Sequence, residues 1–301
     1  MAIFLGIDGG GTKTSCLLGD EHSLLGTGTS GGSNVVRVGE HQARQSLHAA
    51  IQKACASANV APTQIERTCA GIAGGSHPEI ASVVRRLLSE LVSGEIEVVG
   101  DMVIAMEAAF GSGPGVIVIA GTGSIAYGRN AKGETARAGG WGFAISDEGS
   151  GHWIGRSAVT AAMRVYDEGK DAGLLLEHIM KSWGVTTREQ LVVAANGSPD
   201  FAALLPVVLS TADAGDETAR AVLMQAGAEL ATLAIIVIAR LFGNAESVPV
   251  AVSGGVFCHS ALVRQVFEDR LRAEFPEVSL SATLVDPARG ALALVRKGIR
   301  L

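Results

Sequence analysis

The feature that most constrains the fold of this chain is a glycine-rich turn between two short strand-like segments, which occurs once in each half. The first turn covers residues 8–14 and follows the apolar run 3–7. The second covers residues 121–124 and follows the apolar run 116–120. In both places the residues after the turn again have a strand pattern. The repetition predicts two structurally related units, each with one glycine turn at the end of a buried strand.

Apolar periodicity extends this duplication over the chain. Strand patterns are expected at residues 3–7, 14–18, 24–29, 68–73 and 96–99, and helices at 39–59, 77–91 and 102–110. The order βββαβαβα then restarts with strand patterns at 116–120, 124–128 and 133–138, followed by helices such as 217–241, the strands 248–253 and 278–282, and the helices 260–274 and 287–297. This order is typical of an RNase H-like α/β unit. We predict an α/β fold of two such domains, 1–113 plus 286–301 and 114–285, with an interdomain active-site cleft.

Composition narrows the function classes. A length of 301 residues favours two domains. The net charge of −6 without a basic stripe argues against a nucleic-acid partner. The four cysteines show no zinc spacing. The most apolar stretch, 230–239, is shorter than the roughly 20 residues that span a bilayer, and the first residues lack a signal-peptide pattern. We expect a cytoplasmic protein that binds neither membranes nor nucleic acid.

The first turn has the composition of a phosphate-binding loop. Its residues are Asp8, Gly9, Gly10, Gly11, Thr12, Lys13 and Thr14. Glycines allow main-chain N–H groups to approach a phosphate, and a threonine hydroxyl adds a donor. The leading Asp8 is suited to hold Mg²⁺ directly or through water. An ordinary tight hairpin is the competing interpretation, but three successive glycines favour the functional one. The turn is not a Walker A loop, which needs Gly-Lys-Ser/Thr before a helix.

The second turn repeats this device. Its residues are Gly121, Thr122, Gly123 and Ser124. Residues 121–126 formally match the dinucleotide fingerprint, as do residues 26–31, but a strand follows rather than a helix. We therefore interpret 121–124 as a second phosphate loop in the place equivalent to the first.

Four other features are compatible with either a site or ordinary structure. Asp101 follows the apolar strand 96–99 and precedes a helix, so spacing alone leaves a helix cap and a catalytic carboxylate equally plausible. Trp141, between Gly140 and Gly142, suits sugar recognition together with Asp147, but Trp141 could equally pack at a domain boundary and Asp147 could cap a helix. Asn34 suits either a turn or a sugar ligand. Gly254 and Gly255, after the strand 249–252, allow adenine to lie on the main chain but also form a common β–α turn.

Together these motifs resemble the actin-like ATPase superfamily, which contains actin, sugar kinases and heat-shock chaperones. Residues 8–14 look like its first phosphate motif, 120–124 its second, and 253–256 its adenosine motif. Within the superfamily, the chain resembles the N-acetylglucosamine kinase and BadF/BadG ATPase family. That resemblance rests on the motifs at 29–34, 100–101, 121–124, 139–142 and 147–150.

The resemblance implies a reaction and roles. The chain would transfer phosphate from ATP, with Mg²⁺, to the 6-hydroxyl of an amino sugar, foremost N-acetylglucosamine, and Asp101 would take the hydroxyl proton. The implied sugar contacts are Asn34, Asp101, Gly140, Trp141, Gly142 and Asp147. The expected ATP contacts are Gly9, Gly10, Gly11, Thr12, Lys13, Thr14, Gly121, Thr122, Gly123, Ser124, Gly254 and Gly255. Asp8 would be the metal residue. We expect a homodimer.

Four alternatives stay open. Val36 stands where the animal kinases carry an aromatic residue, and bacterial glucosamine kinases resemble the chain too, so glucosamine is the alternative substrate. A dehydratase-activator ATPase would need cysteines for an iron–sulfur cluster, and none flanks Gly121 or Gly139. A sugar-responsive repressor would need a helix-turn-helix extension, and an actin-type filament would leave residues 139–151 without a purpose.

Overall fold

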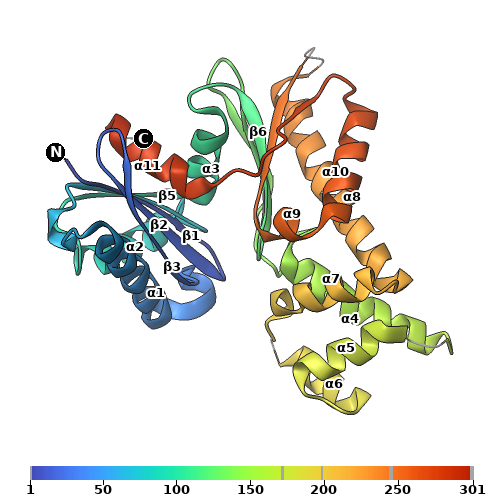
Figure 1. Cartoon of the computed structure of the whole chain (residues 1–301). Helices are drawn as coiled ribbons and strands as arrows, with labels where there is room; N and C mark the ends of the chain where they lie inside the picture. Colours follow the sequence, from blue (N-terminus) through green and yellow to red (C-terminus); the bar gives the residue numbers. More distant parts are fainter. Residues whose placement is uncertain (1, 171–172, 198, 244–246, 299–301) are drawn as a thin grey trace. The chain divides into compact units, whose positions relative to one another are not determined.

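The computed structural model describes residues 2–170, 173–197, 199–243 and 247–298. The chain forms two compact units. One consists of Met1–Ile117, Asn130–Gly133 and Val285–Leu301, and the other of Val118–Arg129 and Glu134–Leu284. The described residues form two five-stranded sheets, one from strands between residues 4 and 100 and the other from strands between residues 115 and 280 (Figure 1). The predicted α/β class is confirmed. The domain limits 1–113 plus 286–301 and 114–285 stay a prediction, and their ends at Met1 and 299–301 lie outside the described residues.

The first sheet has the strand order β3-β2-β1-β4-β5. Its strands are β1 (Phe4–Gly9), β2 (Lys13–Gly19), β3 (Leu24–Gly31), β4 (Arg67–Ile72) and β5 (Glu95–Gly100). β1 and β2, and β2 and β3, pair antiparallel, whereas β4 pairs parallel with β1 and with β5. Its helices are α1 (Val35–Ala58), the 3₁₀ turn η1 (Pro62–Gln64), α2 (Pro78–Ser89), α3 (Asp101–Phe110) and α11 (Pro287–Lys297). The carboxyl ends of β1, β4 and β5 therefore meet at one edge.

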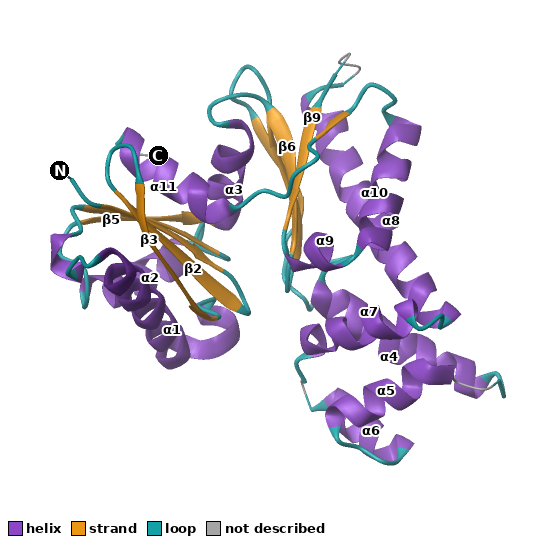
Figure 2. Ribbon diagram, in the orientation of Figure 1, coloured by secondary structure: helices purple, strands orange, loops and turns teal. Residues whose placement is uncertain are grey.

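Helices cover both faces of the first sheet (Figure 2). On one face, α1 and α2 bury an apolar layer that includes Leu47, Ile51 and Leu87 against β1 and β2. On the other face, α3 and α11 cover a smaller cluster. Glycine sets the spacing there, because a Cβ at Gly6 of β1 would lie 2.4 Å from the nitrogen of Leu292. Helix α11 therefore rests directly on the strand that carries Asp8.

The second sheet has the order β10-β9-β6-β7-β8. Its strands are β6 (Gly115–Ala120), β7 (Ser124–Arg129), β8 (Thr135–Gly139), β9 (Pro249–Ser253) and β10 (Ser279–Leu280). Read from the other side, this order is β8-β7-β6-β9-β10, which repeats the order β3-β2-β1-β4-β5 of the first sheet. The sequence-based inference of an internal duplication is thus confirmed in the described strands, and the two glycine turns occupy equivalent places after β1 and β6.

The second unit carries most of the helices. They are α4 (Gly151–Asp167), α5 (Gly173–Trp183), α6 (Arg188–Asn196), η2 (Phe201–Leu204), α7 (Leu205–Asp213), α8 (Glu217–Leu241), α9 (Gly255–His259) and α10 (Ala261–Glu274). Helix α8 is long and apolar enough to cross a bilayer by length and composition, but 61% of its most apolar window is buried inside the protein. It contacts β7, β8, α4 and α10. That burial is typical of a core helix, as the sequence predicted.

Several predicted boundaries differ from the structure, among them those of α1, β8 and β10. Helix α1 begins at Val35 rather than at residue 39, because Asn34 caps a first turn that continues across Gly39. Gly39 has non-helical angles (φ 75°, ψ 162°) and marks a kink. Strand β10 has two residues where the sequence pattern predicted 278–282, and β8 begins at Thr135 rather than at 133. Edge strands have only one pairing partner, so their ends follow local twist more than apolar pattern.

Candidate functional site

The first glycine turn is held rigidly at the end of β1. The nitrogen of Gly10 donates to the carbonyl of Lys13 at 2.9 Å, and the carbonyl of Gly10 accepts from the nitrogens of Ser33 and Asn34 at 3.0 and 3.1 Å. A Cβ at Gly9 would lie 2.4 Å from Cδ1 of Ile72. A side chain at Gly9 would therefore displace the side chains of Ile72 and Ser33, because the turn packs closely against β4 and residues 32–34.

The threonines and the lysine of this turn differ in exposure. Thr12 and Lys13 are exposed. Thr14 is buried, and its hydroxyl lies 2.7 Å from the carbonyl of Gly31 and 2.8 Å from Oγ of Ser33. Its side chain therefore stabilises the turn from behind, whereas Thr12 and Lys13 lie on the solvent side.

Asp8, the acidic residue near the end of β1, has an unusual electrostatic environment. Burial is the main cause that raises the pKa of this carboxyl to about 7, with further contributions from the charges of Asp101 and Asp286 and an opposing one from Lys13. The carboxylates of Asp101, at the start of α3, and of Asp286, the N-cap of α11, thus both act on Asp8 within the first unit. Sequence reasoning missed Asp286, whose position before Pro287 signals only a helix cap; its Oδ1 does accept from the nitrogen of Ala288 at 3.2 Å.

Asp101 is the first residue of α3, and Gly100 is the N-cap residue. Its Oδ1 accepts from the nitrogen of Met102 at 3.0 Å. Burial raises the pKa of this carboxyl, and bonds from the N–H groups of Met102 and of Asp101 itself oppose the rise. The N-cap interpretation of Asp101 is therefore wrong, because Gly100 occupies the cap position and no side chain caps the helix there. The carboxylate has the raised pKa that suits a proton acceptor.

Asn34 caps α1. Its Oδ1 accepts from the nitrogens of Val36 and Arg37 at 3.1 and 3.3 Å, and its own nitrogen donates to Gly10. Asn34 thus connects the first glycine turn to α1. The neighbouring Val36 is 72% exposed, so the place where the resembling animal kinases have an aromatic residue faces solvent in this unit.

The second glycine turn is tied to residues 147–152. Oδ1 of Asp147 accepts from the nitrogen of Ser124 at 3.3 Å, and the hydroxyl of Ser124 donates to the carbonyl of Glu148 at 2.7 Å. The nitrogens of Gly151 and His152 donate to the carbonyls of Gly121 and Thr122 at 2.8 and 3.2 Å. Asp147, for which the sequence allowed either a sugar contact or a helix cap, is buried.

The segment between β8 and α4 presents apolar side chains to solvent. Trp141, Phe143 and Ile145 are 60%, 60% and 77% exposed. The ring of Trp141 carries the guanidinium of Arg137 at 4.0 Å from its centroid, and Phe143 lies against His152 with ring centroids 5.0 Å apart. Gly139, Gly140 and Gly142 all have positive φ. An exposed aromatic face on a glycine-flanked segment is available to a sugar ring.

The pair Gly254 and Gly255 follows β9, and Gly254 lies beside the end of β6, the strand that leads into the second glycine turn. Gly254 has φ 102°, and a Cβ there would lie 2.3 Å from the carbonyl oxygen of Ala120, the last residue of β6. Gly255 begins α9, and a Cβ there would meet only the ring of His259, at 4.0 Å. Gly254 therefore allows the close approach of β9 to β6, whereas Gly255 has open space beside it.

The proposed residues thus form two groups. The first unit contains Asp8, the turn 9–14, Asn34 and Asp101; the second contains the turn 121–124, Gly140, Trp141, Gly142, Asp147, Gly254 and Gly255. Among the described residues, no group of three or more His, Cys, Asp or Glu side chains is arranged to hold a metal ion by itself. Any Mg²⁺ would therefore be held by few protein oxygens together with phosphate and water, which is the usual mode for this ion.

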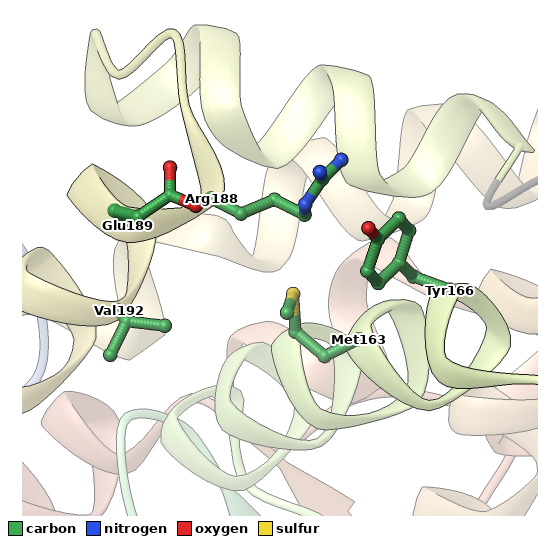
Figure 3. A pocket seen from close by; sticks show the side chains of 5 residues that line it. All are labelled: Met163, Tyr166, Arg188, Glu189 and Val192. Carbon is green, nitrogen blue, oxygen red and sulfur yellow. The ribbon is translucent and has the colours of Figure 1, made fainter.

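A shallow pocket lies elsewhere, between α4 and α6 (Figure 3). It has a volume of about 440 Å³ and is lined by Met163, Tyr166, Arg188, Glu189 and Val192. The guanidinium of Arg188 lies 3.9 Å from the centroid of the Tyr166 ring. None of the sequence-predicted residues lines this pocket, so the glycine turns remain the candidate site.

The chain is similar to known proteins over nearly its whole length. An N-acetylmuramic acid/N-acetylglucosamine kinase of Clostridium acetobutylicum is 30% identical over 98% of this chain and 99% of its own length. An N-acetyl-D-glucosamine kinase of Dictyostelium discoideum is 28% identical over 97% of both chains. A solved structure from Chromobacterium violaceum, provisionally described as an N-acetylglucosamine kinase, has a TM-score of 0.75 at 26% identity and covers 98% of this chain and 99% of its own.

A ROK family glucokinase from Streptomyces griseus, solved with glucose and AMPPNP, shares the fold at a TM-score of 0.62 and 17% identity, covering 99% of this chain and all of its own. Residues 5–295, nearly the whole chain, match one family. With the repeated sheets and glycine turns, this match shows that the chain belongs to the BadF/BadG/BcrA/BcrD ATPase family.

Proposed function

We propose that this protein is an ATP-dependent kinase that phosphorylates the 6-hydroxyl of an amino sugar, foremost N-acetylglucosamine. The observation that carries the proposal is that both curated relatives, which align over nearly the whole chain, are named as kinases that act on N-acetylglucosamine. The first unit supports it with two chemically distinct elements, a rigid glycine turn and a carboxylate with a raised pKa at the start of α3.

Asp101 is the proposed proton acceptor. A sugar hydroxyl is a weak nucleophile while it keeps its proton, and a carboxylate within hydrogen-bond reach orients the hydroxyl and takes that proton as transfer proceeds. Burial raises the pKa of Asp101, which strengthens the carboxylate as a base. The oxygen of the hydroxyl then forms the new bond to the γ-phosphorus, while the bond from that phosphorus to the bridging oxygen of ADP breaks.

The glycine turns are the proposed phosphate contacts. Main-chain N–H groups of 9–14 and 121–124, the hydroxyls of Thr12 and Thr122 and the ammonium of Lys13 would neutralise phosphate charge, and Gly254 and Gly255 would lie against adenosine. Asp8 fits a Mg²⁺ role, because it already repels Asp101 and Asp286 and a cation offsets that repulsion. When bound, Mg²⁺ supplies positive charge to the phosphoryl oxygens.

The sugar contacts are proposed from both groups: Asn34, Asp101, Gly140, Trp141, Gly142 and Asp147. Trp141 offers an exposed ring for the apolar face of the pyranose. A cytoplasmic location and a homodimeric state are part of the proposal, as is the absence of nucleic-acid and membrane partners. In the structure, three of the four cysteines are buried, which is unfavourable for the cluster that a dehydratase-activator ATPase would need.

The test is ATP consumption with a panel of sugars. N-acetylglucosamine should give a higher kcat/KM than glucosamine or glucose, because a site that bonds the acetamido group leaves polar groups unpaired when that group is absent. A higher kcat/KM for glucosamine would establish the alternative substrate. ATP hydrolysis that no sugar stimulates, together with stoichiometric iron and acid-labile sulfide after anaerobic purification, would instead establish the activator function.

A further inference from the structure

We propose that Asp147 is a positioning residue for the nucleotide, because its carboxylate accepts a hydrogen bond from the main chain at the end of the second glycine turn and so holds that turn in place. This inference rests on the proposed use of residues 121–124 as a phosphate loop. Oδ1 of Asp147 accepts the N–H of Ser124, the residue at which the turn ends and β7 begins. Both side chains are buried, with 7% exposure for Asp147 and 3% for Ser124, so water does not replace this bond easily.

The main chain of Asp147 shows that the contact is enforced. Asp147 has φ 70°, and Asn59 is the other described non-glycine residue with positive φ. Side chains disfavour this region, although Asp and Asn tolerate it better than most. Strain of this kind persists where the surroundings require it and is concentrated at functional sites. Here it directs the carboxylate toward Gly123 and Ser124.

The neighbouring residues indicate the same purpose. A Cβ at Gly123 would lie 2.9 Å from Oδ2 of Asp147, so the turn is glycine where the carboxylate contacts it. The hydroxyl of Ser124 donates to the carbonyl of Glu148, and Gly151 and His152 donate to Gly121 and Thr122. Residues 147–152 therefore hold the turn at both ends. Residues 147–152 follow Trp141 and Gly142, which are proposed to contact the sugar. Asp147 therefore links the residues proposed to bind sugar to the turn proposed to bind phosphate.

A positioning role and a sugar-contact role make different predictions for nucleotide binding without sugar. A residue that only contacts sugar leaves the affinity for ADP unchanged. A residue that holds the phosphate turn changes that affinity, and the effect depends on whether the replacement can accept the N–H of Ser124. Asn retains an acceptor oxygen and tolerates positive φ. Gly tolerates positive φ but has no acceptor.

The experiment measures binding of Mg²⁺-ADP by isothermal titration calorimetry, without sugar, to the full chain. Asp147→Gly should weaken binding about tenfold or more, the consequence of losing about 1.4 kcal/mol of binding free energy, whereas Asp147→Asn should stay within about threefold of the original. Asp213→Gly, at the exposed end of α7 in the same unit, controls for the change to glycine. Melting temperatures establish that each variant is folded.

Unchanged ADP affinity in Asp147→Gly would overturn the proposal, and so would equal weakening in the Asn and Gly variants, because the bond to Ser124 would then not be the cause. If Asp147→Gly does not fold, Gly123→Ala tests the same contact from the opposite side; it should weaken ADP binding similarly, and full affinity would overturn the proposal. Since no sugar is present, a failure of the proposed amino-sugar specificity leaves this result intact.

Discussion

Replacing Asp8 with Asn should stabilise the free protein increasingly as the pH rises. The carboxyl has an ordinary pKa of 3.8 and a pKa of about 7 in the folded protein, chiefly because it is buried. For an acid, a raised folded-state pKa means that the folded state binds more protons than the unfolded state between these two values. Stability is therefore lost as the pH rises from 3.8 to about 7, and the full cost is present above that.

The magnitude follows from the same two values. The cost of ionising Asp8 in the folded state is about 4 kcal/mol at pH 8 and about 1.7 kcal/mol at pH 5. Asn does not titrate, so any packing difference it introduces is the same at both pH values. The free energy of unfolding of Asp8→Asn, relative to the original protein, should thus increase by about 2.5 kcal/mol between pH 5 and pH 8.

Urea unfolding measured at both pH values tests this reasoning. Trp141, Trp153 and Trp183 all lie in the second unit, so far-UV circular dichroism is needed to follow the first unit. Asp269→Asn, an exposed position on α10, is the matched control for the change of side chain. If the difference in free energy of unfolding between Asp8→Asn and the original protein stays constant with pH, or decreases as the pH rises, the electrostatic account of Asp8 is refuted. Activity should nevertheless be lost in Asp8→Asn, since stability and function oppose each other at such a position.

Asp101→Asn should lower kcat roughly 10²-fold or more while ADP affinity changes little, because the base is lost but the nucleotide contacts remain; near-normal kcat in a folded variant would remove Asp101 from the mechanism. Excess chelator should abolish phosphoryl transfer, since the main-chain N–H groups and hydroxyls of the turns are neutral and Lys13 alone among the proposed phosphate contacts carries a positive charge; undiminished turnover would contradict the Mg²⁺ proposal. Gly290→Ala should destabilise the first unit by about 1–3 kcal/mol or more, because its Cβ would lie 1.9 Å from the carbonyl oxygen of Ile104; unfolding in urea at the original midpoint would show that α3 and α11 can separate without cost.

Much of the architecture could be predicted from local pattern. The runs of apolar residues before Asp8 and Gly121 predicted two buried strands with glycine turns, and the structure has β1 and β6 there. Helix α8 has the predicted bounds, since a long apolar periodicity leaves little freedom in where a helix begins and ends. The start of α1 was predicted wrongly. Gly39 interrupts the helical pattern, so the sequence placed the start there, whereas the side chain of Asn34 caps the helix one residue before Val35.

The sequence by itself determined where the two glycine turns stand, because each follows an apolar run that forms a buried strand. Only the tertiary structure decided which groups act on them. Asp286 is 278 positions from Asp8, and no spacing rule connects them; α11 brings its charge there by resting on Gly6. In the sequence, Asp147 likewise has the residue type expected of a sugar ligand. Its hydrogen bond to Ser124 forms because β8 pairs with β7 and so brings the following residues back beside the second turn. Charges and hydrogen bonds act through space, so their partners are set by how strands and helices pack.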